Sequence, residues 1–174
     1  MNAKDILKYG HLTVLQVIEG LPEANWEEDG VCGVWSVREI MAHLASYEQL
    51  LVDIFKNLLG APAGPTLNDM FANGPQGFND NQVGARQGWN VAQTLAEYQA
   101  AQAETMALLE KLPAGTTQQT GILPWYGAEY DLDDFLVYTY YGHKREHAAQ
   151  IAVFRDQIRA RFQDSVPAGT KDNN

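Results

Sequence analysis

The stretch Tyr140-Tyr141-Gly142-His143-Lys144-Arg145-Glu146-His147-Ala148-Ala149-Gln150-Ile151 holds two of the chain's four histidines, four residues apart. On an α-helix this spacing places both rings on one face, about one turn apart. The apolar residues that share this face, if the helix is continuous, are Leu136, Tyr140, Phe154 and Ile158. The pair is therefore expected to point into a core. Buried imidazoles need partners, and one divalent metal would satisfy both rings.

The composition indicates one globular domain. The chain has 174 residues, of which 45% are hydrophobic and 20% charged, enough to bury a core. Its net charge of −10 disfavours DNA, RNA or an anionic membrane as a partner. A single cysteine, Cys32, excludes an intrachain disulfide. No apolar run reaches the ~20 residues of a membrane span, and the first residues lack the pattern of a signal peptide, so we expect a cytoplasmic protein.

Apolar periodicity and helix caps predict four long helices, over residues of about 2–21, 36–59, 90–112 and 131–162. The predicted caps are Asn2, Ser36 with Glu39, Asn90 with Gln93, and Asp131. Residues 60–78 and 113–130 are predicted as long connections, with a short helix from Phe78 to Gln87 between them. The pattern indicates an all-α four-helix bundle, a single domain over residues 1–164, with a flexible tail over 165–174.

The height of His43 on the second helix separates two topologies. It lies ~10 Å along its helix, whereas His143 and His147 lie ~18 and ~24 Å along the fourth. In up-down-up-down order, His43 and the His143–His147 pair differ by ~10 Å in height along the bundle axis. In up-down-down-up order, His43 is level with His147. The second order needs a connection that spans the bundle, and residues 60–78 reach that far at ~3.3 Å each. We therefore predict the up-down-down-up order and a three-histidine cluster.

Two interpretations of the cluster stay open at this stage: a metal site, or core histidines that bind no metal. His11 falls near the same height on the first helix. It either lines the pocket, approaches the metal, or is hydrogen-bonded within the core or near its rim.

Glu48, Glu146 and Tyr140 are the candidate catalytic side chains. Glu48 follows His43 by about one turn, and Glu146 adjoins the second histidine of the pair, so either carboxylate could orient an imidazole or act as a base. The alternative for both is a carboxylate in solvent or at a seam between helices. Tyr140 could place its hydroxyl in the pocket or serve only as core.

The segment Trp35-Ser36-Val37-Arg38-Glu39-Ile40-Met41-Ala42-His43-Leu44, with His143-Lys144-Arg145-Glu146-His147 and Gln150-Ile151 about 100 residues later, resembles the DinB/YfiT-like superfamily. The tyrosine-rich sequence before the histidine pair is similar to the ClbS/DfsB branch. The resemblance implies an up-down-down-up bundle with one histidine ligand on helix 2 and two on helix 4. These correspond to His43, His143 and His147. The resemblance also implies a divalent metal, nickel or zinc, and a homodimer.

Three neutral nitrogen ligands leave at least one coordination position open, which is typical of a catalytic metal site. That position could hold a water of lowered pKa, or a thiolate that attacks an electrophile. The family that the chain resembles includes thiol-dependent transferases, isomerases and hydrolases. We therefore expect a metal-dependent S-transferase or hydrolase for a small electrophilic substrate, with a low-molecular-weight thiol as candidate cosubstrate. The alternative function is a non-catalytic dimeric bundle that sequesters a small molecule or binds a protein partner.

Overall fold

Side-chain caps begin the helices where the sequence pattern predicts them. The computed structural model describes residues 2–165, so the predicted tail lies outside it apart from Ser165. The Asn2 side-chain oxygen accepts a hydrogen bond from the backbone N–H of Asp5. Ser36 and Asn90 each form a reciprocal capping box with the residue three positions on. These caps satisfy N–H groups that the first helical turn leaves unpaired.

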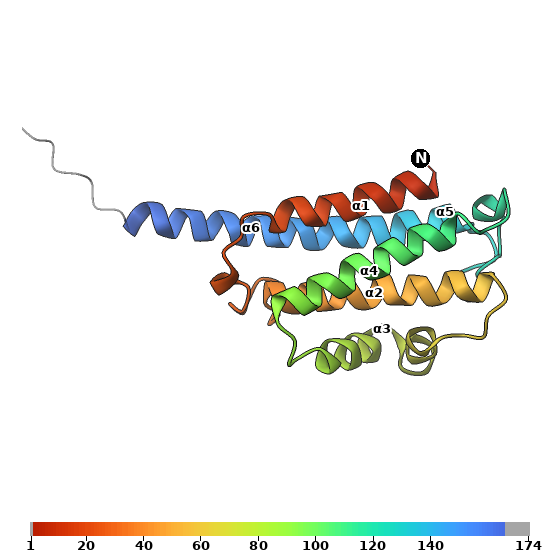
Figure 1. The fold of residues 1–174 in the computed structure, drawn as a ribbon, viewed down its shortest axis with the longest axis horizontal. Helices are drawn as coiled ribbons and strands as arrows, with labels where there is room; N and C mark the ends of the chain where they lie inside the picture. Colours follow the sequence, from red (N-terminus) through yellow and green to blue (C-terminus); the bar gives the residue numbers. More distant parts are fainter. Residues whose placement is uncertain (1, 166–174) are drawn as a thin grey trace, which may run out of the picture.

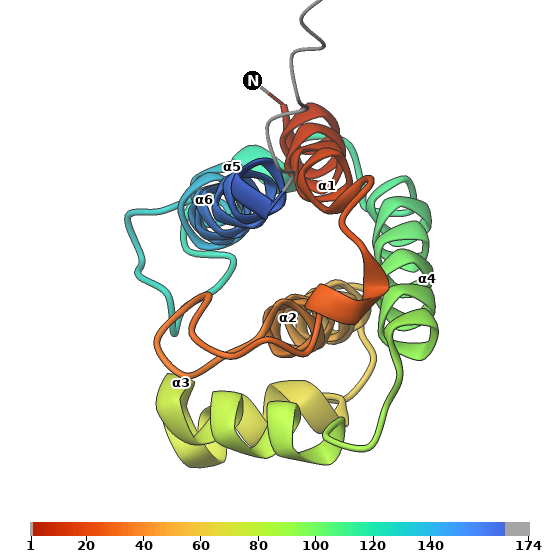
Figure 2. The same cartoon turned by 90° about the vertical axis from the view of Figure 1, so that its left-hand side faces the viewer.

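Four long helices form the bundle (Figures 1 and 2). They are α1 (Ala3–Ile18), α2 (Val37–Leu58), α4 (Val91–Leu109) and α6 (Gly142–Ser165). In Figure 1, α1 and α6 run in one direction and α2 and α4 in the other. Helix α1 packs mainly on α6, and α2 mainly on α4. The predicted up-down-down-up order is thus confirmed.

The connection between α2 and α4 contains a longer helix than predicted. Helix α3 (Pro65–Ala85) bends at Gly74, whose φ of 65° is left-handed, and continues from Pro75. The prediction of an irregular connection over residues 60–78 is therefore wrong from residue 65 onward. The prolines and glycines of this stretch are typical helix breakers, but a proline is tolerated in the first turn of a helix, and Pro65 and Pro75 each begin one half of the bent helix.

Helix α3 is capped by a side chain from α2. The Asp53 carboxylate accepts hydrogen bonds from the backbone N–H groups of Thr66 (2.8 Å) and Leu67 (3.2 Å). A Cβ added at Gly64 would lie 2.2 Å from the Asp53 carboxylate, so this approach needs glycine. Because the cap is distant in sequence, local periodicity cannot reveal it.

The last helix has an irregular start. A short helix, α5 (Leu132–Phe135), is followed by π-helical turns over Leu136–Tyr141, which run directly into α6. The N–H of Gly142 bonds to the carbonyl of Val137, five residues back. The predicted fourth helix is therefore continuous in direction, but with wider turns just before His143.

The core has two apolar halves separated by a polar layer. One half holds the start of α1 and the end of α2, and the other holds the end of α1 and the start of α2. Between them lie polar side chains of all four long helices: the buried His43, Glu48, Gln102, Lys144 and His147, together with the half-buried His11. Buried polar groups need specific partners, so this layer is the place to look for a site.

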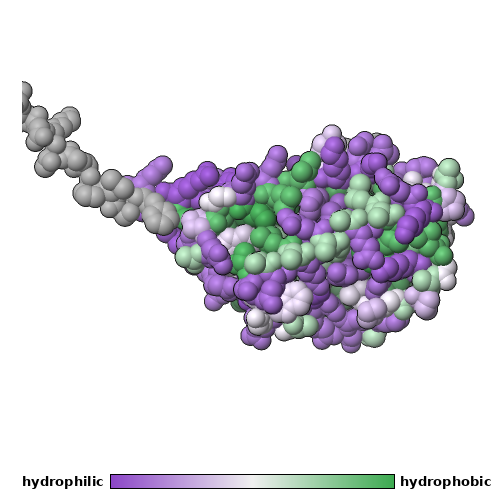
Figure 3. Space-filling view, in the orientation of Figure 1, coloured by the Kyte–Doolittle hydropathy of each residue, from purple (hydrophilic) through white to green (hydrophobic). Residues whose placement is uncertain are grey.

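The visible surface is predominantly hydrophilic. In Figure 3, green hydrophobic residues gather in patches over and between α1, α4 and α6 and do not form one continuous apolar face. No helix in residues 2–165 is long and apolar enough to cross a membrane.

Candidate metal centre

Three histidines from two helices meet in the polar layer. His43 comes from α2, and His143 and His147 come from α6. The Nε2 atoms of His43 and His143 lie 2.7 Å apart, and those of His143 and His147 lie 3.0 Å apart. One nitrogen from each ring lies within 4.8 Å of the other two. The predicted cluster therefore forms, and it does so because α2 and α6 are antiparallel.

Gln150 fixes the orientation of one ring. Its side-chain oxygen lies 2.8 Å from Nδ1 of His147. A carboxamide oxygen accepts, so Nδ1 carries the proton and Nε2 keeps its lone pair toward the other two rings. Sequence reasoning missed this partner, although its signal was present: Gln150 follows His147 by three residues and so shares its helix face.

Two aromatic rings pack against His43: Trp35, which precedes α2, and Tyr47, which lies one turn after His43 on α2. The Trp35 ring centroid lies 4.8 Å from that of His43, and the Tyr47 ring meets it edge-on at 4.9 Å. Tyr47 also contacts His143, at 4.6 Å between centroids. Trp35 also lies 6.5 Å from His147 between ring centroids, so it forms a wall of the cluster. These rings limit both ring rotation and access of water.

Burial keeps the three imidazoles neutral. His43 and His147 expose only 2% and 6% of their surface. Desolvation, reinforced by the neighbouring His147 and Lys144, lowers the pKa of His143 to about 3. Desolvation, together with the other two histidines, also lowers the pKa of His43 far below its ordinary value. At neutral pH all three rings are therefore in the form that binds metals.

The donor set fits a divalent metal. Three ligands at ~2.0–2.1 Å in tetrahedral geometry leave their nitrogens ~3.3 Å apart. Two separations in this cluster are 2.7 and 3.0 Å, and the third is no more than 4.8 Å, so small side-chain shifts would produce that geometry. Nδ1 of His43 is buried and has no hydrogen-bond partner among residues 2–165, so no hydrogen bond turns Nε2 of this ring away from the other two histidines. Imidazole ligands suit zinc and nickel among other metals. The cluster is thus compatible with a divalent metal held by three histidines.

Glu48 pairs with a lysine and not with an imidazole. Its Oε1 lies 2.5 Å from Nζ of Lys144, and both side chains are almost completely buried. Lys144 also donates a hydrogen bond to Gln102 at 3.4 Å. The ion pair therefore links α2, α4 and α6 beside the histidines, which makes Glu48 a candidate for positioning His143 through its neighbour.

The other predicted catalytic side chains differ in burial. Glu146 is exposed on α6, and its charge opposes the fall in pKa that burial causes at His147. Tyr140 is 1% exposed, and its hydroxyl has no hydrogen-bond partner. Burial, with Glu48 nearby, raises its pKa well above the ordinary range. Tyr140 therefore stays protonated in the core, whereas the Glu146 carboxylate is accessible to solvent.

His11 lies in the polar layer but outside the three-histidine cluster. Its ring stacks on Tyr98 with centroids 5.0 Å apart. Burial and the charge of Lys144 lower its pKa to about 4. His11 is half-buried, and its Nδ1 has no hydrogen-bond partner among residues 2–165, so the structure shows neither a ligand of the cluster nor the hydrogen bond expected for this ring.

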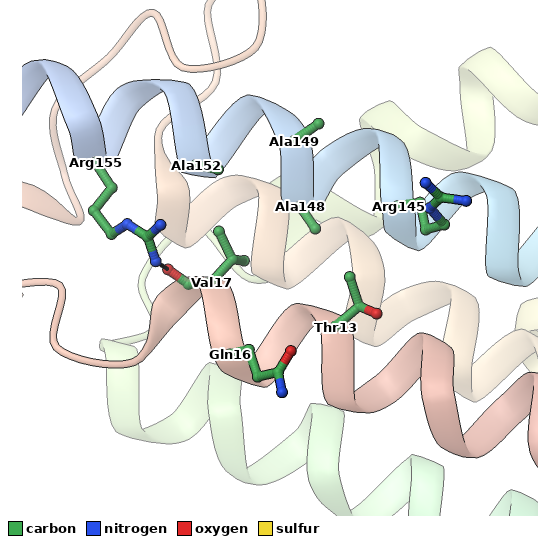
Figure 4. A pocket seen from close by; sticks show the side chains of 8 residues that line it. All are labelled: Thr13, Gln16, Val17, Arg145, Ala148, Ala149, Ala152 and Arg155. Carbon is green, nitrogen blue, oxygen red and sulfur yellow. Dashed lines mark hydrogen bonds between the residues drawn. The ribbon is translucent and has the colours of Figure 1, made fainter.

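A groove on the outer side of the α1–α6 pair has a volume of 350 Å³ and is open to solvent. Figure 4 shows Val17 and Thr13 of α1 pointing toward α6, and Ala148 of α6 pointing toward α1. Arg155 donates a hydrogen bond to the carbonyl of Val17. No histidine lines this groove. It is therefore separate from the candidate metal centre.

Known proteins resemble this chain in sequence pattern and in fold. The family model described as the DinB superfamily matches residues 11–151, a range that contains all three histidines of the cluster. No curated protein matches the chain. Among solved structures, a crystal structure of a protein from Streptococcus pneumoniae matches with a TM-score of 0.67 at 10% identity, over 88% of each chain. At this identity the likeness shows the fold alone.

Proposed function

The chain belongs to the DinB superfamily, and from this premise we propose that it is a metal-dependent enzyme acting on a small electrophile, as a thiol-dependent S-transferase or a hydrolase. The observation that carries the proposal is the approach of three neutral Nε2 atoms within a buried layer. When bound, nickel or zinc would act as a Lewis acid and lower the pKa of a water or thiol at the open position.

The residues around the cluster have separate roles in this proposal. Gln150 holds His147 in the tautomer that binds metal. Tyr47 and Trp35 keep bulk water from the rings. Glu146, which is exposed beside His147, takes the proton that the incoming nucleophile gives up. Glu48 acts through Lys144 as a positioning residue.

Metal analysis of untagged protein tests the proposal first. We expect stoichiometric nickel or zinc in the wild type and its loss in His147→Ala. His11→Ala is the matched control, because it removes a histidine of the same polar layer that lies outside the cluster. Wild-type protein without metal, or a His147→Ala variant that retains it, would refute the metal site.

A turnover assay then tests the chemistry. Loaded protein is given a small electrophile with and without a low-molecular-weight thiol, and conjugation and hydrolysis are followed separately. Glu146→Gln should lower kcat on the order of 100-fold and leave the metal content unchanged.

The proposal extends to a homodimer, which light scattering on purified protein would detect as twice the mass of one chain.

A further inference from the structure

A cavity lined by uncharged side chains lies beside the histidine cluster, in contrast to the groove between α1 and α6, which has two arginines in its lining. It has a volume of 180 Å³ and lies between α2, α3, the 113–130 connection and the start of the last helix. Its walls include Tyr47, Met70, Pro75, Trp125, Phe135 and Thr139. None of the side chains that line it is charged. A pocket of this kind excludes ions and favours an apolar occupant.

Aromatic contacts keep the cavity walls in place. The Trp125 ring is perpendicular to that of Phe135, with centroids 5.5 Å apart, and it also contacts Phe71 of α3 at 5.6 Å. Pro75, which follows the bend of α3, supplies part of the opposite wall. The bend of α3 therefore helps to shape the cavity, and residues 60–78, which the sequence predicts as an irregular connection, contribute Met70 and Pro75 to its walls.

Tyr47 joins the cavity to the histidines. It lines the cavity, and its ring is also in edge contact with His43 and His143. Thr139, another wall residue, precedes His143 by four residues on the same helical segment. A group inside the cavity is therefore separated from the imidazoles by a single side chain.

The volume limits the size of the occupant. An apolar cavity of ~150 Å³ in another protein takes up benzene, so 180 Å³ accommodates one six-membered ring. It is too small for a fused ring system with substituents. Aromatic walls favour an aromatic ring through edge-to-face contacts.

We propose that this cavity binds an uncharged, single-ring aromatic group of the substrate, and that Tyr47 positions that group beside the three histidines. This assignment of substrate class rests on the proposed function. Ring binding itself does not need the metal, since the cavity walls contain no metal ligand. The two proposals can therefore fail separately.

The test uses metal-free, full-length protein and two probes of the same size, benzyl alcohol and benzoate, followed by NMR titration. Benzyl alcohol should bind and should shift the ring resonances of His43 and His143 more than those of His11. Benzoate should bind at least about tenfold more weakly, because its charge loses hydration in an apolar pocket. His147→Ala should bind benzyl alcohol as the wild type does.

Two variants decide whether the probe occupies this cavity. Met70→Trp fills it from a half-buried position and should weaken benzyl alcohol binding at least about tenfold. Trp125→Ala removes a wall whose side chain is 46% exposed, so it should weaken binding without unfolding the protein. Leu12→Trp, on α1 and away from the cavity, is the matched control and should bind normally. Equal binding of both probes, or normal binding by Met70→Trp, would overturn the inference.

Discussion

At the scale of single residues, the site depends on side chains that hold other side chains in place. Gln150 holds His147 through a 2.8 Å contact, and Tyr47 and Trp35 enclose His43. Outer partners of this kind set ring orientation and ligand basicity in metal sites. Their loss should weaken metal binding without unfolding the chain.

Gln150→Leu tests that expectation. The leucine keeps the side chain's size but cannot accept the Nδ1–H of His147, so the ring loses its fixed tautomer. We expect metal affinity to fall by about 10- to 100-fold, measured by competition with a chelator. Gln157→Leu, on an exposed position of the same helix, should bind metal with unchanged affinity. Equal affinities of the two variants would show that Gln150 has no such role.

The buried pair of Glu48 and Lys144 gives a second test at this scale. Glu48→Leu leaves the lysine buried and unpaired, and should lower the free energy of unfolding by about 3–5 kcal/mol. Adding Lys144→Met should restore most of that loss, because an apolar pair of similar volume costs little in a core. Urea denaturation of both variants measures this. If the double variant were as unstable as the single one, the pair itself would be required for the fold.

At the scale of elements, sequence reasoning succeeded where the signal was local. The caps at Asn2, Ser36 and Asn90 and the 3,4-spacing of apolar residues located the four long helices. Helix α3 was largely missed because its cap, Asp53, lies on another helix. The π-helical turns over Leu136–Tyr141 were also missed, since they have no composition that distinguishes them from an α-helix.

Asp53→Ala tests the tertiary cap of α3. Three hydrogen bonds to Asp53 from the first turn of α3 are lost, and we expect a cost of about 1–2 kcal/mol. Hydrogen exchange should quicken in residues 66–73 and much less in α4. Uniform quickening across the bundle would instead indicate that α3 unfolds only together with the other helices.

At the scale of the whole molecule, the site follows from topology. The height argument placed His43 level with His147 only if the second and fourth helices were antiparallel, and α2 and α6 are so arranged. The three-histidine cluster could therefore be predicted from the sequence. The apolar cavity could not, because Tyr47, Met70 and Trp125 are brought together only by the bend of α3 and the following connections.

The polar layer also predicts acid sensitivity of the metal-free protein. The pKa of His11 falls from 6.5 to about 4 on folding, so between these values the unfolded chain binds a proton that the folded chain does not. Protonation of His11 should therefore not change the free energy of unfolding above about pH 7. It should lower that free energy as the pH drops below 6.5. Thermal unfolding in chelator from pH 7.5 to 5 should show a shallower decline for His11→Phe. Identical slopes would contradict the prediction.

The central claim is that His43, His143 and His147 hold one divalent metal. Anomalous diffraction from crystals of untagged protein, recorded on both sides of the nickel and zinc absorption edges, tests it most directly. We predict one peak within ~2.0–2.1 Å of all three Nε2 atoms, with at least one further coordination position free of protein ligands. Crystals of metal-saturated protein with no peak among these three rings, or with a peak bound elsewhere, would contradict the account.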